Sequence, residues 1–304
     1  MTGFSIDRRT LLAAAIGGSM STSARLFAAP VSAPRLLVLF LRGAYDSASV
    51  LVPNSSFYAE SRPTLAIPRS GTGAAIGLDG NWGLNPVLAP SLLPFWKKGE
   101  LAFIPFAGTH DLSRSHFATQ DLVEYGQAPG ARPAAPSGFM NRLAAELSGA
   151  SALAFTKQLP LAFRGPIAVP NVPPADRAAK TNPRHAALLS GMYARDKQLG
   201  AQVEAGFASQ KMVSEALATE MATSGKGAIA ASGFELAARQ IGKVMRGRPN
   251  LCFADVGGWD THVAQRGGLD FHLGVLGRGL AGFAAEIGPV EWKRTTVLVI
   301  SEFG

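Results

Sequence analysis

Short apolar runs that stop abruptly at polar residues are the most regular feature of the chain. Residues 36–41, 251–256 and 296–300 form such runs, which are typical of strands buried on both faces of a parallel sheet. Residues 101–106 form a further run and predict another strand. Helical spacing predicts helices at about 87–98, 184–223, 233–245 and 269–287. Strands alternating with helices predict an α/β fold, with a mostly parallel sheet flanked by helices and joined by right-handed crossovers.

Polar residues able to carry chemistry follow each of these runs. They are Asp46, the cluster 111–116, the pair Asp260 and His262, and Glu302. Parallel strands end at one edge of their sheet, and ligands bind in the crevice outside that edge. We therefore expect these clusters, although distant in sequence, to meet in one site.

The residue types at this edge indicate a divalent metal. Asp260 and His262 follow two glycines and stand two residues apart, so both side chains can point toward one cation. Carboxylates and imidazole suit Zn, Mn, Mg or Ca. Alternatively, Asp260 caps a turn and His262 is a surface residue. Asp46 and Glu302, taken singly, are equally compatible with turn residues, and only their shared position favours the metal.

Ser113 and Ser115 lie where a helix is expected to begin. Backbone N–H groups and the positive end of a helix dipole would stabilise a phosphate or a nucleophilic alkoxide there. Ser115 is the first candidate nucleophile and Ser113 the second, although serine is also a favoured N-cap. Arg114 and His116 are candidate substrate-binding residues, because a guanidinium grips anionic oxygens in a bidentate manner. Arg114 is equally compatible with a solvated loop charge.

The first 29 residues are expected to be an export signal rather than part of the folded domain. Arg8 and Arg9 precede two leucines and a weakly apolar run rich in Ala and Gly, a pattern that resembles a twin-arginine export signal. The alternative is a short amphipathic helix. Export predicts a periplasmic or secreted protein, with the twin-arginine machinery as a partner. That route carries folded proteins, often with a cofactor already inserted.

The composition of the chain excludes several classes of protein. Of the 304 residues, 47% are apolar and 16% charged, which excludes intrinsic disorder. The longest clean apolar run is residues 36–41, too short for a transmembrane helix. The net charge of +8 comes from scattered basic residues without a nucleic-acid motif, so we expect no nucleic-acid partner. Cys252 is the only cysteine, which leaves no internal disulfide.

Four motifs in order carry a family resemblance. They are Leu41-Arg42-Gly43-Ala44-Tyr45-Asp46, Ser113-Arg114-Ser115-His116-Phe117, Gly257-Gly258-Trp259-Asp260-Thr261-His262 and Ser301-Glu302-Phe303-Gly304. With the export signal, they resemble the exported bacterial family called domain of unknown function 1501. That family is similar to the alkaline phosphatase and sulfatase superfamily, which implies a three-layer core at 34–304 and metal-dependent hydrolysis of small anionic phosphate or sulfate esters. By position, the resemblance makes Ser115 the nucleophile, and Asp46, Asp260, His262 and Glu302 the metal ligands.

This sequence departs from the superfamily pattern in several places. Glu302 replaces an aspartate, Phe303 stands where a metal-binding histidine is expected, and Asp260 and His262 are unusually close in sequence. The sequence also ends at Gly304, before later histidine-bearing segments that the resemblance implies, and so predicts a truncated product. These departures support an alternative hypothesis, an exported, non-catalytic binding or assembly protein that retains the fold.

Overall fold

The computed structural model describes residues 33–127, 137–172, 183–194, 196, 199–209, 211–212, 233–261 and 265–303. The larger sheet consists of β1 (Arg35–Leu41), β5 (Ala152–Phe155), β6 (Leu251–Val256) and β7 (Thr295–Ser301). These strands are parallel and lie in the order β5-β6-β1-β7. A smaller antiparallel sheet consists of β2 (Leu51–Pro53), β3 (Ile76–Gly77) and β4 (Trp82–Leu84).

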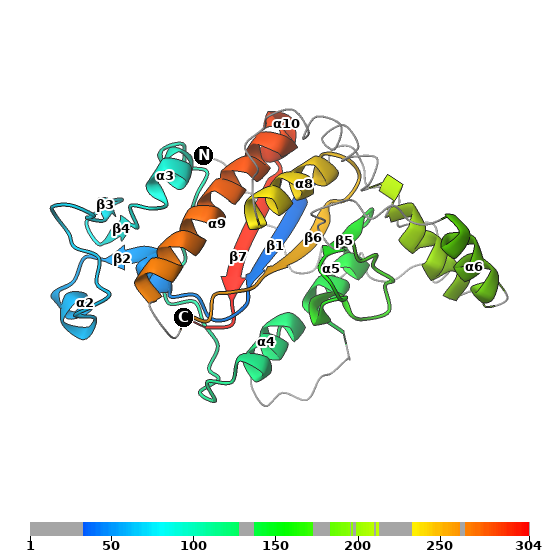
Figure 1. The fold of residues 1–304 in the computed structure, drawn as a ribbon, viewed down its shortest axis with the longest axis horizontal. Helices are drawn as coiled ribbons and strands as arrows, with labels where there is room; N and C mark the ends of the chain where they lie inside the picture. Colours follow the sequence, from blue (N-terminus) through cyan, green and yellow to red (C-terminus); the bar gives the residue numbers. More distant parts are fainter. Residues whose placement is uncertain are drawn as a thin grey trace, which may run out of the picture.

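Helices surround the larger sheet (Figure 1). The α-helices are α2 (Ser56–Ser61), α3 (Ala89–Lys97), α4 (His116–Tyr125), α5 (Phe139–Glu146), α6 (Pro183–Tyr193), α8 (Phe234–Arg246), α9 (Gln265–Ile287) and α10 (Pro289–Trp292). Two short 3-10 helices are η3 (Ser47–Ser49) and η4 (Leu161–Phe163). The mixed α/β fold with a parallel sheet flanked by helices, expected from the sequence, is confirmed.

Strands β1, β5 and β6 are largely buried on both faces, whereas β7 exposes Thr296 and Leu298. Successive residues of a strand point to opposite sides of the sheet. Leu37 and Leu39 of β1 pack toward α8 and α9 on one face. Val38 and Phe40 pack toward α5 and η4 on the other. The alternation explains why the central strands read as continuous apolar runs, since neither face is left for polar side chains.

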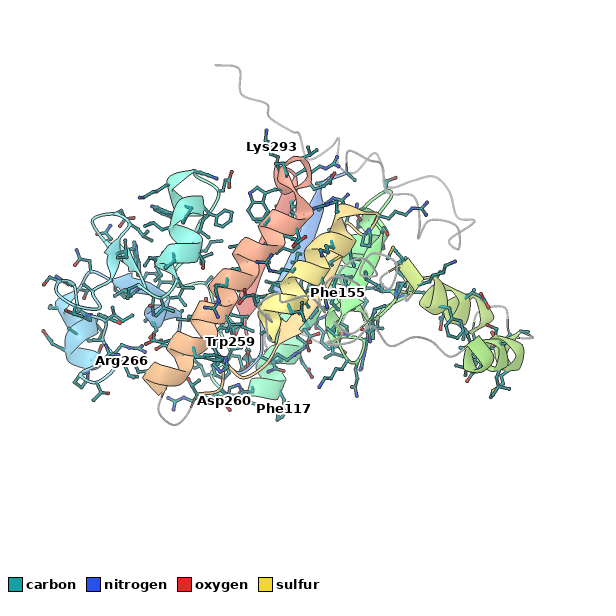
Figure 2. The ribbon with its side chains drawn as sticks, turned by 45° about the horizontal axis from the view of Figure 1, so that its top comes forward. Phe117, Phe155, Trp259, Asp260, Arg266 and Lys293 are labelled. Carbon is teal, nitrogen blue, oxygen red and sulfur yellow. The ribbon has the colours of Figure 1, made fainter. Side chains whose placement is uncertain are left out.

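A third apolar cluster joins the smaller sheet and α3 to the end of β1. It contains Leu41, Leu84, Leu88 and the buried Trp259, packed against Leu273 of α9. Figure 2 shows Trp259 and the neighbouring Asp260 beside this helix. The apolar anchorage of Trp259 therefore fixes where the chain leaves β6 and where Asp260 is held.

The expected strand at residues 101–106 is wrong, because the structure has no strand there. Leu101 and Phe103 pack into the third cluster, whereas Ile104 is 77% exposed and Phe106 is 95% exposed. Phe106 also has a φ of +60°, which is incompatible with a strand. The apolar residues at 101–106 therefore belong to a half-buried loop.

Other expectations agree with the structure to different extents. Helix α6 and the helical residues 199–209 fall within the predicted span 184–223, of which residues 213–223 lie outside the described part. Strand β5 was not anticipated, because four residues with two alanines give a weak pattern. The export segment 1–29 also lies outside the described residues. No helix in the described part of the chain is long and apolar enough to cross a membrane.

We expect the aromatic layer under the sheet to dominate stability. Phe253 is fully buried, and its ring lies 6.3 Å from that of Phe40 and 6.4 Å from that of Phe163. Phe253→Ala should lower the free energy of unfolding by about 3–5 kcal/mol, because it leaves a cavity. Phe57→Ala, at a position 74% exposed, should change it by less than about 0.5 kcal/mol. Urea unfolding of both variants tests this, and equal effects would contradict the packing described here.

Candidate functional site

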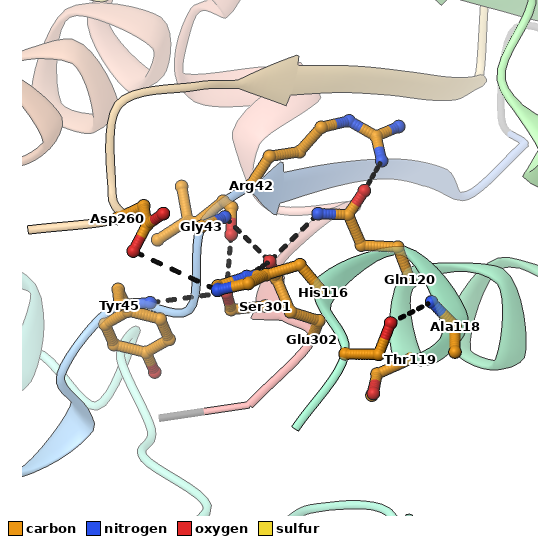
Figure 3. Close-up of polar contacts among 12 residues, drawn as sticks. Arg42, Gly43, Tyr45, His116, Ala118, Thr119, Gln120, Asp260, Ser301 and Glu302 are labelled. Carbon is orange, nitrogen blue, oxygen red and sulfur yellow. Dashed lines mark hydrogen bonds and ion pairs between the residues drawn. The ribbon is translucent and has the colours of Figure 1, made fainter. Parts of the chain in front are cut away.

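The ends of β1, β6 and β7 lie side by side. Leu41 is paired with Val256 on one side and with Ser301 on the other. The residues that follow these strands therefore emerge at one edge of the sheet, where open parallel sheets bind ligands. Figure 3 shows the polar contacts that form there.

Glu302 is the central acceptor of this group, although its residue is only 1% exposed. Its Oε1 accepts hydrogen bonds from the Gly43 amide at 2.8 Å and from Gln120 Nε2 at 2.9 Å, and lies 2.8 Å from His116 Nδ1. Burial raises the pKa of Glu302, but the hydrogen bonds from His116, Gln120 and Gly43 outweigh burial and lower it to about 2. The carboxyl is therefore ionised at neutral pH.

His116 is the first residue of α4 and points into this edge. Because the ionised Glu302 can only accept, Nδ1 of His116 carries a proton. In the neutral tautomer with this proton, the lone pair lies on Nε2. Nε2 lies 3.9 Å from Asp260 Oδ1. The Phe303 ring packs on the imidazole at 4.8 Å between centroids. The imidazole is 31% exposed, so solvent and small ligands can reach it.

Gly43 allows the chain after β1 to pass against Asp260. It has a φ of +119°, and a Cβ added to it would lie 2.4 Å from the Asp260 amide nitrogen. The adjacent Trp259 amide donates to the Arg42 carbonyl at 3.3 Å. These contacts hold the loop after β6 against the end of β1, and so position Asp260 near His116.

Ser113 and Ser115 belong to the turn that starts α4. Ser113 Oγ donates to Asp111 Oδ2 at 2.9 Å and accepts from the Ser115 amide at 3.2 Å. Ser115 is the N-cap, and its Oγ accepts from the Ala118 amide at 3.4 Å. Hydrogen bonds from Thr119 and Ser113 lower the pKa of Asp111. Ser115 thus makes the capping contact that serine makes at helix starts, whereas Ser113 bridges residues of the turn before the helix.

Arg114, between the two serines, is exposed and has a φ of +56°. Its charge is therefore available to solvent beside the first turn of α4.

Asp46 lies in a different set of contacts from His116. Its carboxylate pairs with Arg62, accepts from Ser49 Oγ at 2.7 Å and accepts from Gln265 Nε2 at 3.1 Å. These bonds tie the loop after β1 to α9. His262 lies outside the described residues.

The structure therefore brings His116, Asp260 and Glu302 together. Within the described ranges, no group of three or more His, Cys, Asp or Glu side chains is arranged to hold a metal ion. His116 Nε2 and Asp260 Oδ1 face each other as two atoms that could bind a metal ion.

Arg42 and Gln120 are parts of this edge that sequence reasoning did not single out. Arg42 Nη1 donates to Gln120 Oε1 at 3.0 Å, and Gln120 in turn donates to Glu302. A charged residue directly after a buried strand was the one available signal for Arg42. Nothing in the sequence distinguishes Gln120 unless the position of α4 against the sheet edge is known.

The fold and this edge define an α/β protein with a polar site at the carboxyl ends of parallel strands. Residues 106–304 match the family described as "Protein of unknown function (DUF1501)". The chain belongs to this family. Neither a curated protein nor a solved structure matches the chain.

Substitution of Gly43 should disturb the site and the fold together. Gly43→Ala places a Cβ against the Asp260 backbone at an unfavourable φ, and should lower the free energy of unfolding by about 1–3 kcal/mol. The matched control is Gly257→Ala, where an added Cβ has no neighbour within 4 Å. Urea unfolding of both variants is the measurement, and a neutral Gly43→Ala would contradict the close approach described here.

The ionised Glu302 gives stability a defined pH dependence. Its pKa falls from an ordinary 4.5 to about 2 on folding, so its contribution is present above pH 4.5 and is lost as the pH falls toward 2. In Glu302→Gln this contribution is absent. The difference in unfolding free energy between wild type and variant should therefore shrink across that window. A difference independent of pH would show that Glu302 titrates normally in the folded protein.

Proposed function

We propose that this protein is an exported, metal-dependent hydrolase of small phosphate or sulfate esters. The observation that carries the proposal is the pair formed by His116 and Asp260, which come from distant parts of the chain. His116 Nε2 faces Asp260 Oδ1 at 3.9 Å, while Nδ1 is hydrogen-bonded to a buried carboxylate. The pair opens at the sheet edge where ligands of α/β proteins bind.

Three considerations support a divalent cation at this pair, which the described residues do not by themselves complete as a metal site. Ligand bonds to tetrahedral Zn of about 2.0–2.2 Å place two ligand atoms roughly 3.3–3.6 Å apart. The His116–Asp260 distance of 3.9 Å would have to shorten by a few tenths of an ångström to bind such an ion. Histidine ligands commonly donate their other N–H to a carboxylate that fixes the ring, as Glu302 does here. His262, two residues after Asp260, is a candidate third ligand. A bound cation would polarise the ester and activate the nucleophile.

Ser115 is the proposed nucleophile, with Ser113 as the second candidate. Ser115 stands at the N-terminus of α4, where backbone N–H groups and the helix dipole favour the anionic group of a substrate. Its bond to the Ala118 amide is long, at 3.4 Å, and exchange of that bond would free the hydroxyl for attack. Arg114, the exposed residue before it, is the proposed partner of an ester oxygen.

Export through the twin-arginine machinery is part of the same proposal. It rests on the Arg8-Arg9 pair followed by Leu11-Leu12 and a weakly apolar run. We infer that the site operates in the periplasm or outside the cell.

A second candidate function is non-catalytic binding or assembly. Two observations favour it. Both serine hydroxyls are engaged in hydrogen bonds at the start of α4, and the Asp46 carboxylate pairs with Arg62. A protein of this kind would keep the sheet edge as a binding surface without turning over a substrate.

Hydrolysis assays separate the two functions. The purified protein is stripped with a chelator, supplied with Zn²⁺, Mn²⁺, Mg²⁺ or Ca²⁺, and assayed with nitrophenyl phosphate and nitrophenyl sulfate. We expect activity to return with metal, and His116→Gln and Asp260→Asn to lower kcat/KM about 100-fold. Asp121→Asn, at an exposed position on α4, is the matched control and should retain activity.

Two outcomes would count against the proposal. Wild-type protein that takes up no metal and hydrolyses neither ester would favour the non-catalytic function. Ser115→Ala with undiminished kcat would remove Ser115 as the nucleophile, and the same variant of Ser113 then tests the second candidate.

A further inference from the structure

Helix α4 turns a row of polar residues toward the end of the sheet, beside Val123, which packs against the core under it. His116, Gln120 and Glu124 are spaced four residues apart and therefore lie on one helix face. His116 and Gln120 both contact Glu302. Glu124 is only 3% exposed, so this polar face is partly buried.

Arg42 joins two turns of this face to the sheet. Its Nη1 donates to Gln120 Oε1 at 3.0 Å, and its Nη2 donates to Glu124 Oε1 at 2.9 Å. Its Nε donates to Asp255 Oδ2 at 2.9 Å, and its guanidinium lies over the Phe40 ring at 4.9 Å. A planar guanidinium with a fixed fork can serve these acceptors at once, and a lysine ammonium cannot.

The contacts have a fixed direction. Because Arg42 can only donate, the Gln120 carbonyl oxygen faces Arg42 and the Gln120 amide nitrogen faces Glu302. The second carboxylate oxygen of Glu124, Oε2, accepts a hydrogen bond from the Ala162 amide at 2.9 Å. A shift of α4 by one turn in one direction would bring the Glu124 carboxylate against Glu302, and in the other would bring the His116 ring N–H against the Arg42 guanidinium. Both leave buried charged groups mismatched, which is costly. An apolar helix face would tolerate such sliding better.

We propose that Arg42 and Gln120 are positioning residues that fix the docking of α4, and thereby the place of His116 opposite Asp260. Arg42 acts through Gln120 and Glu124, and Gln120 acts through Glu302. Neither residue needs to touch a substrate. The effect on metal affinity rests on the proposed function, whereas the docking of α4 does not.

Hydrogen exchange of the whole protein tests the docking. Arg42→Lys keeps the positive charge near Glu124 but loses the fork, and should speed amide exchange at least 10-fold along α4 while β1 and β6 stay protected. Gln120→Met leaves the Arg42–Glu124 pair intact, and should affect the first turns of α4 more than its end. Arg278→Lys, in an exposed pair with Glu235, is the matched control and should leave α4 unchanged.

Metal titration supplies the second readout. If the proposed function holds, Arg42→Lys and Gln120→Met should weaken Mn²⁺ or Zn²⁺ binding about 10-fold, and Arg278→Lys should not. Unchanged exchange in α4 for both variants, or faster exchange spread evenly over the protein, would overturn the positioning role. Faster exchange confined to α4 in a protein that binds no metal would uphold it and refute the metal-dependent function instead.

Discussion

The buried carboxylate of Glu302 holds together three parts of the chain that are far apart in sequence. An ionised side chain is stable in such a place only if it is fully hydrogen-bonded. The Gly43 amide, Gln120 and His116 supply that bonding, from the end of β1 and from α4. The same bonds that make the buried charge tolerable also orient the imidazole. Stability and site geometry therefore depend on one group.

The apolar core holds the strand ends in place, and so fixes the positions of the polar groups at the sheet edge. Clusters on both faces hold β1 and its neighbours in register. The third cluster anchors Trp259 and with it the loop that carries Asp260. Gly43 permits the close passage of the two strand ends. Precise placement at the edge thus follows from packing below it, whereas α4 meets the edge itself through polar contacts.

Sequence patterns were sufficient to predict the strands whose burial dictates the type of residue. The runs 36–41 and 251–256 were recognisable as strands because both faces of the sheet are covered there. The run 296–300 was recognisable from its β-branched and apolar residues, although β7 exposes Thr296 and Leu298. Their shared edge then placed Asp260 and Glu302 near one another. Of the cluster 111–116, His116 reaches the edge, and for a different reason than expected: residues 101–106 form a loop, and α4 carries His116 to Glu302.

The remaining features could not be read from sequence because they depend on tertiary partners. Asp46 pairs with Arg62, a residue that no spacing rule connects to it. Arg42 and Gln120 gain their roles only when the face of α4 is known to meet the sheet edge.

Mn²⁺ bound in crystals of the protein and located by its anomalous scattering tests the central claim most directly, because it shows the ion itself. We expect one peak between His116 Nε2 and Asp260, with Glu302 still hydrogen-bonded to Nδ1. A fully occupied ion elsewhere, or an imidazole turned away from Glu302, would contradict the account.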